Sequence, residues 1–116
     1  TREGSISNTD SFKNRRDYIS SYHDALMEIK ERTPWHKAEG IRAFSIAYLV
    51  LCKSCIGQGH VEDEQLKVIK KYRRMVQLEL RDVKKEINLN IKEKMELWMA
   101  FRNPEFFVKI CCMFRR

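Results

Sequence analysis

The sequence contains few of the residues that interrupt helices. Of its 116 residues, only four are glycine and two are proline. Each proline follows a residue suited to a helix N-terminus, Thr33 before Pro34 and Asn103 before Pro104, so both prolines predict helix starts. No segment alternates apolar and polar residues as a half-buried strand does, and there is no internal repeat or low-complexity tract. These absences argue against a β architecture and predict an all-α fold.

The sequence also lacks an apolar run long enough to cross a bilayer. The longest nearly uninterrupted run, Ala43 to Cys52, has ten residues, whereas a spanning helix needs about 20. Residues 1–20 are polar and contain no apolar signal-peptide core. We therefore expect an intracellular protein, cytoplasmic or nuclear. The chain does not begin with methionine and ends on Arg115 and Arg116 directly after an apolar segment, which favours an excised domain or a processed fragment.

Catalytic signatures are missing as well. The sequence has no glycine-rich phosphate loop, no H-E-x-x-H zinc motif and no G-x-S-x-G nucleophile elbow. Its three histidines have no recognisable partner at a useful spacing, and His23 falls near the apolar face of a predicted helix. Cys55 and His60 could form a thiolate pair, but such a pair occurs by chance in many sequences. We expect a non-enzymatic protein without catalytic residues or a cofactor.

Four cysteines are present, and their spacing argues against a disulfide scaffold. Cys52 and Cys55 lie one helical turn apart, and Cys111 and Cys112 are adjacent. Both spacings give poor geometry for pairing within either couple. The pattern therefore favours a reducing compartment.

Part of a metal-binding motif is present at the first cysteine pair. Cys52, Cys55 and His60 match the first three ligands of a zinc knuckle, C-x2-C-x4-H-x4-C, but the fourth position is Gln65. A closed zinc site needs four donors. A fourth donor would have to come from elsewhere in the chain: Cys111, Cys112, His23 or His36. Because Cys52 also continues an apolar helical pattern, we interpret the group as two buried thiols and a surface histidine, and we expect no bound metal.

Apolar spacing predicts a bundle of four main helices with a short fifth helix. After a disordered segment, residues 1–9, a single helical domain is expected over residues 10–116. The predicted helices are residues 10–32, 34–56 and 61–89, a fourth helix that begins at residue 90, and residues 104–114. The second helix is apolar on nearly every side over residues 43–52, so we expect the others to enclose it. Gly57 or Gly59 suits its C-terminal end, and Asn90 with Glu93 has the form of a capping box.

The third predicted helix is strongly amphipathic. At 100° per residue its apolar side chains fall on one side, which predicts a core face: Leu66, Ile69, Tyr72, Val76, Leu80, Val83 and Ile87. Six basic side chains fall on the opposite side, interrupted only by Leu78 and Asp82, and we call these six the basic stripe: Lys67, Lys70, Lys71, Arg74, Arg81 and Lys85. The net charge of the chain is +7, and the surplus lies in its second half. Such a surplus favours an anionic partner.

Two interpretations of the basic stripe are open. A surface helix must expose polar residues, and lysine and arginine are good helix formers, so the stripe could serve solvation alone. A solvated face usually mixes charges, however, and here Glu62, Asp63 and Glu64 are confined to the first turn. The functional interpretation is nucleic-acid binding, with RNA favoured, through the duplex backbone. The stripe carries no aromatic side chain on which single strands could stack.

The alternative function is a helical protein-interaction module, regulatory or adaptor in kind and part of a larger protein, whose stripe meets an acidic protein partner. Its interface would use apolar residues of the fourth helix and the tail: Met95, Trp98, Met99, Phe106, Phe107 and Phe114. A homodimer would use the same surface. It would also cover the end of the third helix near Val83 and Ile87, because the third helix is expected to outrun the first by roughly 9 Å.

The tail also allows a membrane interpretation. Palmitoylation of the adjacent Cys111 and Cys112 would attach it to a lipid surface. Such a segment is more often a last core helix or a protein interface. We therefore expect packing within the protein or against a partner in preference to lipid anchoring.

Overall fold

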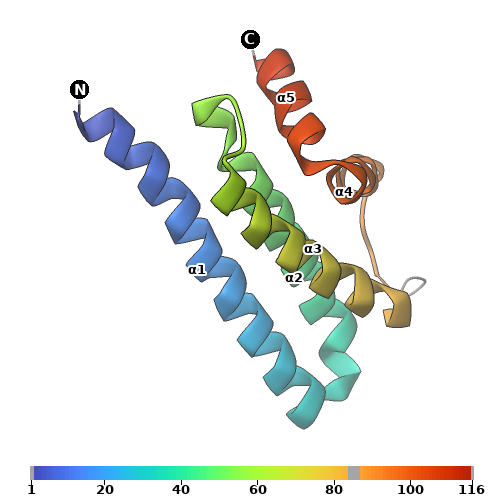
Figure 1. Ribbon diagram of the computed structural model, residues 1–116. Helices are drawn as coiled ribbons and strands as arrows, with labels where there is room; N and C mark the ends of the chain where they lie inside the picture. The colour runs from blue at the N-terminus through green and yellow to red at the C-terminus, as the bar shows by residue number, and fades with distance from the viewer. Residues whose placement is uncertain (1, 84–86, 116) are drawn as a thin grey trace.

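The computed structural model describes residues 2–83 and 87–115, and these residues form an all-α fold (Figure 1). The described elements are α1 (Arg2–Arg32), η1 (Pro34–His36), α2 (Lys37–Lys53), η2 (Ile56–Gln58), α3 (Asp63–Val83), α4 (Ile91–Arg102) and α5 (Pro104–Arg115), where η marks a short 3-10 turn. No strand occurs within these ranges. The predicted all-α fold is confirmed, and α4 and α5 are equal in length at 12 residues each.

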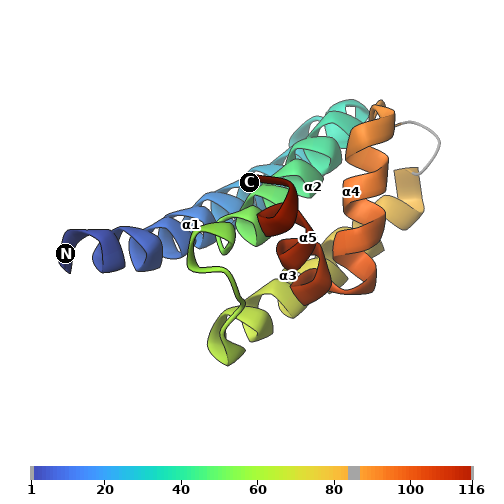
Figure 2. The same ribbon diagram turned by 90° about the horizontal axis from the view of Figure 1, so that it is seen from above.

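Helix α2 lies at the centre of the bundle. After η1 the chain reverses so that α2 runs antiparallel to α1, and α3 then runs back along α2 (Figure 1). Helix α4 stands across the long direction of α1 and α2, and α5 packs against η2 and α2 (Figure 2). Phe44, Tyr48 and Leu51 of α2 are fully buried. The expectation that residues 43–52 are enclosed by the other helices is therefore confirmed.

The apolar side of α3 faces this core, as its sequence pattern predicts. Six of the seven residues predicted for this face are buried or packed against the buried cluster, five within α3 and Ile87 in the segment that follows it: Ile69, Tyr72, Val76, Leu80, Val83 and Ile87. The seventh, Leu66, is half-buried. The ring of Tyr72 packs edge-on against Phe44 of α2, with 6.3 Å between ring centroids. The predicted core face of α3 is therefore confirmed.

Two helix boundaries differ clearly from the sequence prediction, and the first is the start of α1. This helix begins at Arg2 instead of residue 10, so the segment 1–9, expected to be disordered, has a helical backbone from Arg2 onward. The stretch from Arg2 to Arg32 contains no proline. Extending an existing helix costs far less than starting one, and the capping residues at positions 9 and 10 do not interrupt it.

The second difference is the length of α3, which covers 21 residues in place of the 29 predicted over residues 61–89. Its start shifts to Asp63 because Glu62 takes the N-cap position. The Glu62 carbonyl accepts from the Leu66 amide at 2.8 Å, and the Glu62 amide donates to the Gln65 side chain at 3.0 Å. Residues 87–90 are not helical. Because α1 has 31 residues, the predicted overhang of the third helix beyond the first is wrong.

Side-chain caps mark the helix starts in the second half of the chain. The Asn90 side chain accepts from the Glu93 amide at 2.7 Å, and the Glu93 carboxylate accepts from the Asn90 amide at 3.1 Å, which confirms the capping box. Asn103 caps α5 by accepting from the Phe106 amide at 3.1 Å. Earlier in the chain, α2 ends at Lys53 and η2 follows it. Gly59, with a φ of +79°, adopts the left-handed conformation that ends η2.

The C-terminal end of α4 is hydrogen-bonded to two other helices. Pro104 has no amide hydrogen, so the Ala100 carbonyl lacks the usual helical donor four residues later. The buried Tyr48 hydroxyl of α2 donates to this carbonyl at 2.9 Å. The Arg73 guanidinium of α3 donates to the Phe101 carbonyl at 3.2 Å. These two bonds position α4 against α2 and α3.

One described segment, Pro34–Gln58, is long and apolar enough to cross a membrane when judged by length and composition alone. It consists mainly of α2, and half of its most apolar window is buried inside the protein. The core helix of a helical bundle meets the same criteria. The central position of α2 among the other helices accounts for this apolar composition.

Candidate functional site

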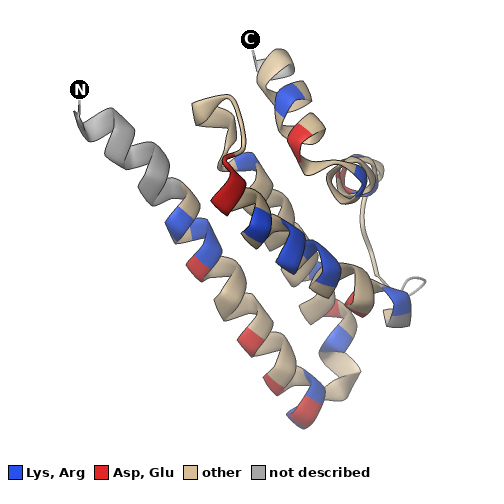
Figure 3. Ribbon diagram, viewed as in Figure 1, with Lys and Arg blue, Asp and Glu red and all other residues tan. Residues whose placement is uncertain are grey.

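The basic stripe lies on the outer side of α3. Five of its members are exposed: Lys67, Lys70, Lys71, Arg74 and Arg81. The sixth, Lys85, lies outside the described residues. Figure 3 shows basic residues following one another along α3. From Lys67 to Arg81 the stripe extends roughly 21 Å at 1.5 Å per residue. Leu78, whose side chain is 50% exposed, interrupts it as predicted.

The five described stripe cations are not paired with the carboxylates that the structure describes. Elsewhere, ion pairs link different helices. Lys30 of α1 contacts Glu79 of α3 at 2.7 Å, and Lys53 of α2 contacts Glu96 of α4 at 2.7 Å. None of the five described stripe cations forms an ion pair with a described carboxylate. Among the described residues, these five cations are therefore left to solvent and to any anionic partner.

Glu79 is an acid of α3 that is engaged away from the stripe. Sequence periodicity places it on a flank of the helix, and in the structure it is 9% exposed. The ammonium group of Lys30 donates to both of its carboxylate oxygens, at 2.7 and 2.9 Å. This pairing across α1 and α3 could not be found from the sequence, because the two residues are 49 positions apart.

No aromatic side chain is available for stacking among the exposed members of the stripe. The Tyr72 ring is buried on the core side of α3, with the Lys71 ammonium 5.5 Å from its centroid. Arg73 is half-buried and donates to α4. The stripe itself therefore offers charge and shape, and the nearest aromatic ring along α3, that of Tyr72, is not a platform for nucleobases.

The predicted protein-interaction residues divide into three groups. Met95, Trp98 and Phe106 are exposed, at 61%, 62% and 56%. Met99 is half-buried against the core, and Phe107 is only 2% exposed. Assigning Phe107 to an interface was wrong, because α5 packs on α2 and η2 and buries that side of its helix. The side chain of Phe114 lies outside the described part of the structure.

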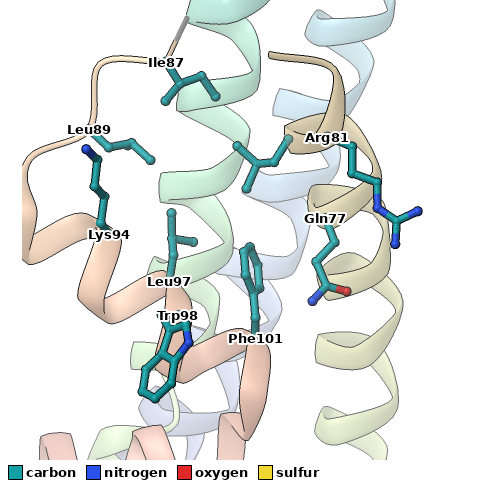
Figure 4. A pocket seen from close by; sticks show the side chains of 9 residues that line it. Gln77, Arg81, Ile87, Leu89, Lys94, Leu97, Trp98 and Phe101 are labelled. Carbon is teal, nitrogen blue, oxygen red and sulfur yellow. The ribbon is translucent and has the colours of Figure 1, made fainter. Parts of the chain in front are cut away.

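A groove that sequence periodicity did not predict opens between α3 and α4. It has a volume of about 620 Å³, and nine residues line it: Gln77, Leu80, Arg81, Ile87, Leu89, Lys94, Leu97, Trp98 and Phe101. Figure 4 shows Leu97, Trp98 and Phe101 on α4 at one side of the groove and Gln77 and Arg81 on α3 at the other. Six of the nine are apolar, two are basic and none is acidic. Its basic members are Arg81, which also belongs to the stripe, and Lys94.

The groove could not be located in the sequence because α4 crosses α3 instead of lying along it (Figure 2). One signal was available. Lys94, Leu97, Trp98 and Phe101 occur at i, i+3, i+4 and i+7, the spacing of one helix face. That pattern could equally have belonged to a face packed on the core.

The two cysteines of the partial zinc motif are buried, and the residue at its fourth position is hydrogen-bonded within the chain. Cys52 and Cys55 are buried, whereas His60 is exposed. The Gln65 side chain, at the fourth ligand position, contacts the Gln58 side chain and accepts from the Glu62 amide. Within the described ranges, no group of three or more His, Cys, Asp and Glu residues is placed to hold a metal ion.

The four thiols differ in environment. Burial raises the pKa of Cys52 to about 12 and the pKa of Cys55 to about 11. Cys111 and Cys112 are half-buried where α5 meets η2, and the Cys112 thiol donates to the Ile56 carbonyl at 3.3 Å. Burial also raises the pKa of Cys111. Reactive cysteines have depressed pKa values and accessible sulfur atoms, so the environment of Cys52 and Cys55 fits packing better than catalysis.

Comparison with protein-family models, with curated proteins and with solved structures finds no match. Function must therefore be inferred from the molecular surface. Two features of that surface go beyond what a stable bundle needs: the basic stripe of α3 and the adjoining groove, with Arg81 common to both.

Proposed function

We propose that this chain is a non-enzymatic helical domain that binds nucleic acid, RNA in particular, through the basic stripe of α3. One observation carries the proposal: five exposed cations follow one rigid helix without an ion pair to any described carboxylate. Cations that neutralise phosphates release condensed counterions, and this release supplies most of the non-specific affinity for nucleic acid. The stripe supplies such cations in a fixed row.

The geometry of the stripe favours a duplex over a single strand. Proteins that bind single strands combine basic side chains with aromatic rings for base stacking, and Tyr72, the aromatic residue nearest to Lys71, is buried. Duplex RNA is recognised mainly by shape, through contacts with phosphates and 2′-hydroxyl groups. A straight row of cations about 21 Å long suits contact with a duplex backbone. Binding is expected to be modest in affinity and independent of sequence.

The test compares stripe and control variants in RNA binding. Replacing Lys70, Lys71 and Arg74 by glutamate should abolish binding to a short RNA duplex while circular dichroism shows unchanged helix content. For the unaltered chain, the logarithm of affinity should fall with the logarithm of salt concentration by about 0.9 per phosphate contacted, taking the value for duplex DNA as a guide. Gel shifts with duplex RNA, single-stranded RNA and duplex DNA in parallel would measure both effects.

A matched control separates the stripe from net charge. Lys13, Arg15 and Arg16 are exposed on α1, and replacing them by glutamate changes the net charge by the same amount. This control variant should keep most of its affinity for RNA. Equal loss in both variants would mean that only net charge matters, and undiminished binding by the stripe variant would refute the proposal.

The groove favours a second candidate function, docking of a protein partner. Trp98 lines the groove and is 62% exposed, with the Arg102 guanidinium 5.5 Å from its ring centroid. Tryptophan and arginine are among the residues most enriched at protein-interface hot spots. The two candidate functions use surfaces that meet at Arg81, so the chain could serve both.

A further inference from the structure

The groove between α3 and α4 has an apolar interior. Leu97 is buried at its base, and Leu80 and Phe101 are half-buried beside it. Ile87 and Leu89, from the segment before α4, continue the apolar lining. Pockets of this size commonly take a ligand whose apolar part is buried between a few polar groups. The lining is thus suited to large apolar side chains from outside the chain.

The rim of the groove carries positive charge. Arg81 and Lys94 line it from opposite helices, both are exposed, and neither pairs with a described carboxylate. The acids of α4 are engaged elsewhere: Glu93 caps its own helix and lies 3.6 Å from Arg42, and Glu96 pairs with Lys53. An occupant must therefore combine apolar side chains with negative charge.

The apolar surface continues along α4 beyond the groove. Ile91, Met95 and Trp98 occur at i, i+4 and i+7 and are 77%, 61% and 62% exposed. They lie on one face of α4, next to the face that lines the groove. A compact small ligand would cover the groove alone, whereas an elongated amphipathic element would also cover this row.

We propose that the groove between α3 and α4 docks an acidic amphipathic helix of a protein partner. The apolar face of that helix would fill the groove and cover Met95 and Ile91, and its carboxylates would meet Arg81 and Lys94. Laying an amphipathic helix into a groove is a general mode of peptide recognition, with anchors at i, i+3, i+4 and i+7. The occupant is identified by charge complementarity, since the described residues that line the groove include two basic side chains and no acid. This binding does not depend on the proposed nucleic-acid function.

A designed peptide tests the proposal directly. The probe is a fluorescein-labelled peptide of about 18 residues, or five helical turns, with leucine on one face and glutamate on the other. Two comparison peptides carry lysine in place of glutamate, or the acidic composition in scrambled order. Fluorescence anisotropy with the full chain should show micromolar binding of the acidic amphipathic peptide. The scrambled peptide should bind at least about tenfold more weakly, and the basic peptide should not bind.

Paired variants locate the site without disturbing the core. Trp98→Ala should weaken binding by at least about tenfold, as truncation of an interface hot spot does. Trp35→Ala, which removes a tryptophan that is 73% exposed at η1, should leave binding unchanged. Lys94→Glu should weaken binding several-fold, whereas Lys70→Glu, with the same charge change on the stripe, should alter it by less than about twofold.

Several results would overturn the proposal. They are absence of acidic-peptide binding at millimolar concentration, equal binding of the scrambled peptide, and equal losses in Lys94→Glu and Lys70→Glu. A dimer in sedimentation equilibrium that Trp98→Ala dissociates would assign the surface to a second copy of the chain instead. RNA binding is measured on the same variants. Because neither Lys94→Glu nor Trp98→Ala alters the stripe, failure of the groove proposal is distinguishable from failure of the nucleic-acid proposal.

Discussion

At the scale of single residues, Tyr48 donates a structural hydrogen bond in addition to packing in the apolar core. Its hydroxyl reaches the Ala100 carbonyl, whose helical donor is missing because residue 104 is proline. Burial raises the pKa of Tyr48 far above its usual value, so the hydroxyl remains a donor at any physiological pH. Tyr48 thus replaces the hydrogen bond that the Ala100 carbonyl lacks because Pro104, the first residue of α5, has no amide hydrogen.

Tyr48→Phe should therefore destabilise the protein by about 1 to 3 kcal/mol, the cost of a buried polar group left without a partner. Urea unfolding followed by circular dichroism would measure the change. Tyr18→Phe is the matched control, because the Tyr18 hydroxyl lies at the surface and bonds to the Tyr22 hydroxyl there, and it should cost less than about 0.5 kcal/mol. Equal effects of the two substitutions would contradict the assigned role of Tyr48.

At the scale of helices, α1 and α2 approach each other closely at Gly40. A Cβ atom there would lie 3.0 Å from the Leu26 Cδ1 atom and 3.2 Å from the Ile29 Cδ1 atom. Leu26 is fully buried, so its side chain has little room to move. The absence of a side chain at position 40 therefore lets the two helices pack together.

Gly40→Val should destabilise the protein by roughly 1 to 3 kcal/mol, because the added atoms overpack the contact between α1 and α2. Glu39→Val introduces the same residue at the adjacent exposed position and should cost under about 1 kcal/mol. Thermal unfolding of both variants gives the comparison. If Gly40→Val is the more stable of the two, the close approach is not a constraint on this helix pair.

Features set by neighbours along the chain could be predicted from the sequence. The capping box at Asn90, the start of α5 at Pro104 and the core face of α3 follow from spacing alone, and the structure confirms them. The pairing of Glu79 with Lys30, the burial of Phe107 and the groove depend on how helices cross, which periodicity does not encode. Sequence periodicity predicts that the stripe cations are exposed. It does not predict which basic residues pair with the carboxylates near them.

At the scale of the whole molecule, the distribution of charge opposes folding slightly. The chain has a net charge of +7, and the stripe places several of these charges close together on α3. Like charges in a compact state repel one another, and salt screens this repulsion within about 10 Å at 0.1 M. A row of cations without ion pairs to the described carboxylates thus has a cost in stability that a solvated face of mixed charge would avoid.

Raising the salt concentration from about 10 mM to about 0.5 M should therefore increase the melting temperature of the unaltered chain. Lys70→Glu should be more stable at low salt and should gain less from added salt, because it removes one repelling charge and adds an attractive one. Differential scanning calorimetry at several sodium chloride concentrations would test this. A melting temperature that falls with salt would show that attractive ion pairs, and not the stripe, dominate the electrostatics of the fold.

Arg81 belongs both to the stripe and to the lining of the groove, and this sharing creates a thermodynamic linkage between the two proposed ligands. An acidic helix that pairs with Arg81 withdraws one cation from the row available to phosphates, so each ligand weakens the binding of the other. By reciprocity, the factor must be the same in both directions. A partner protein with an acidic helix would then weaken RNA binding without contacting most of the stripe, and bound RNA would weaken the binding of that partner. A single arginine side chain would thus couple the two forms of binding negatively.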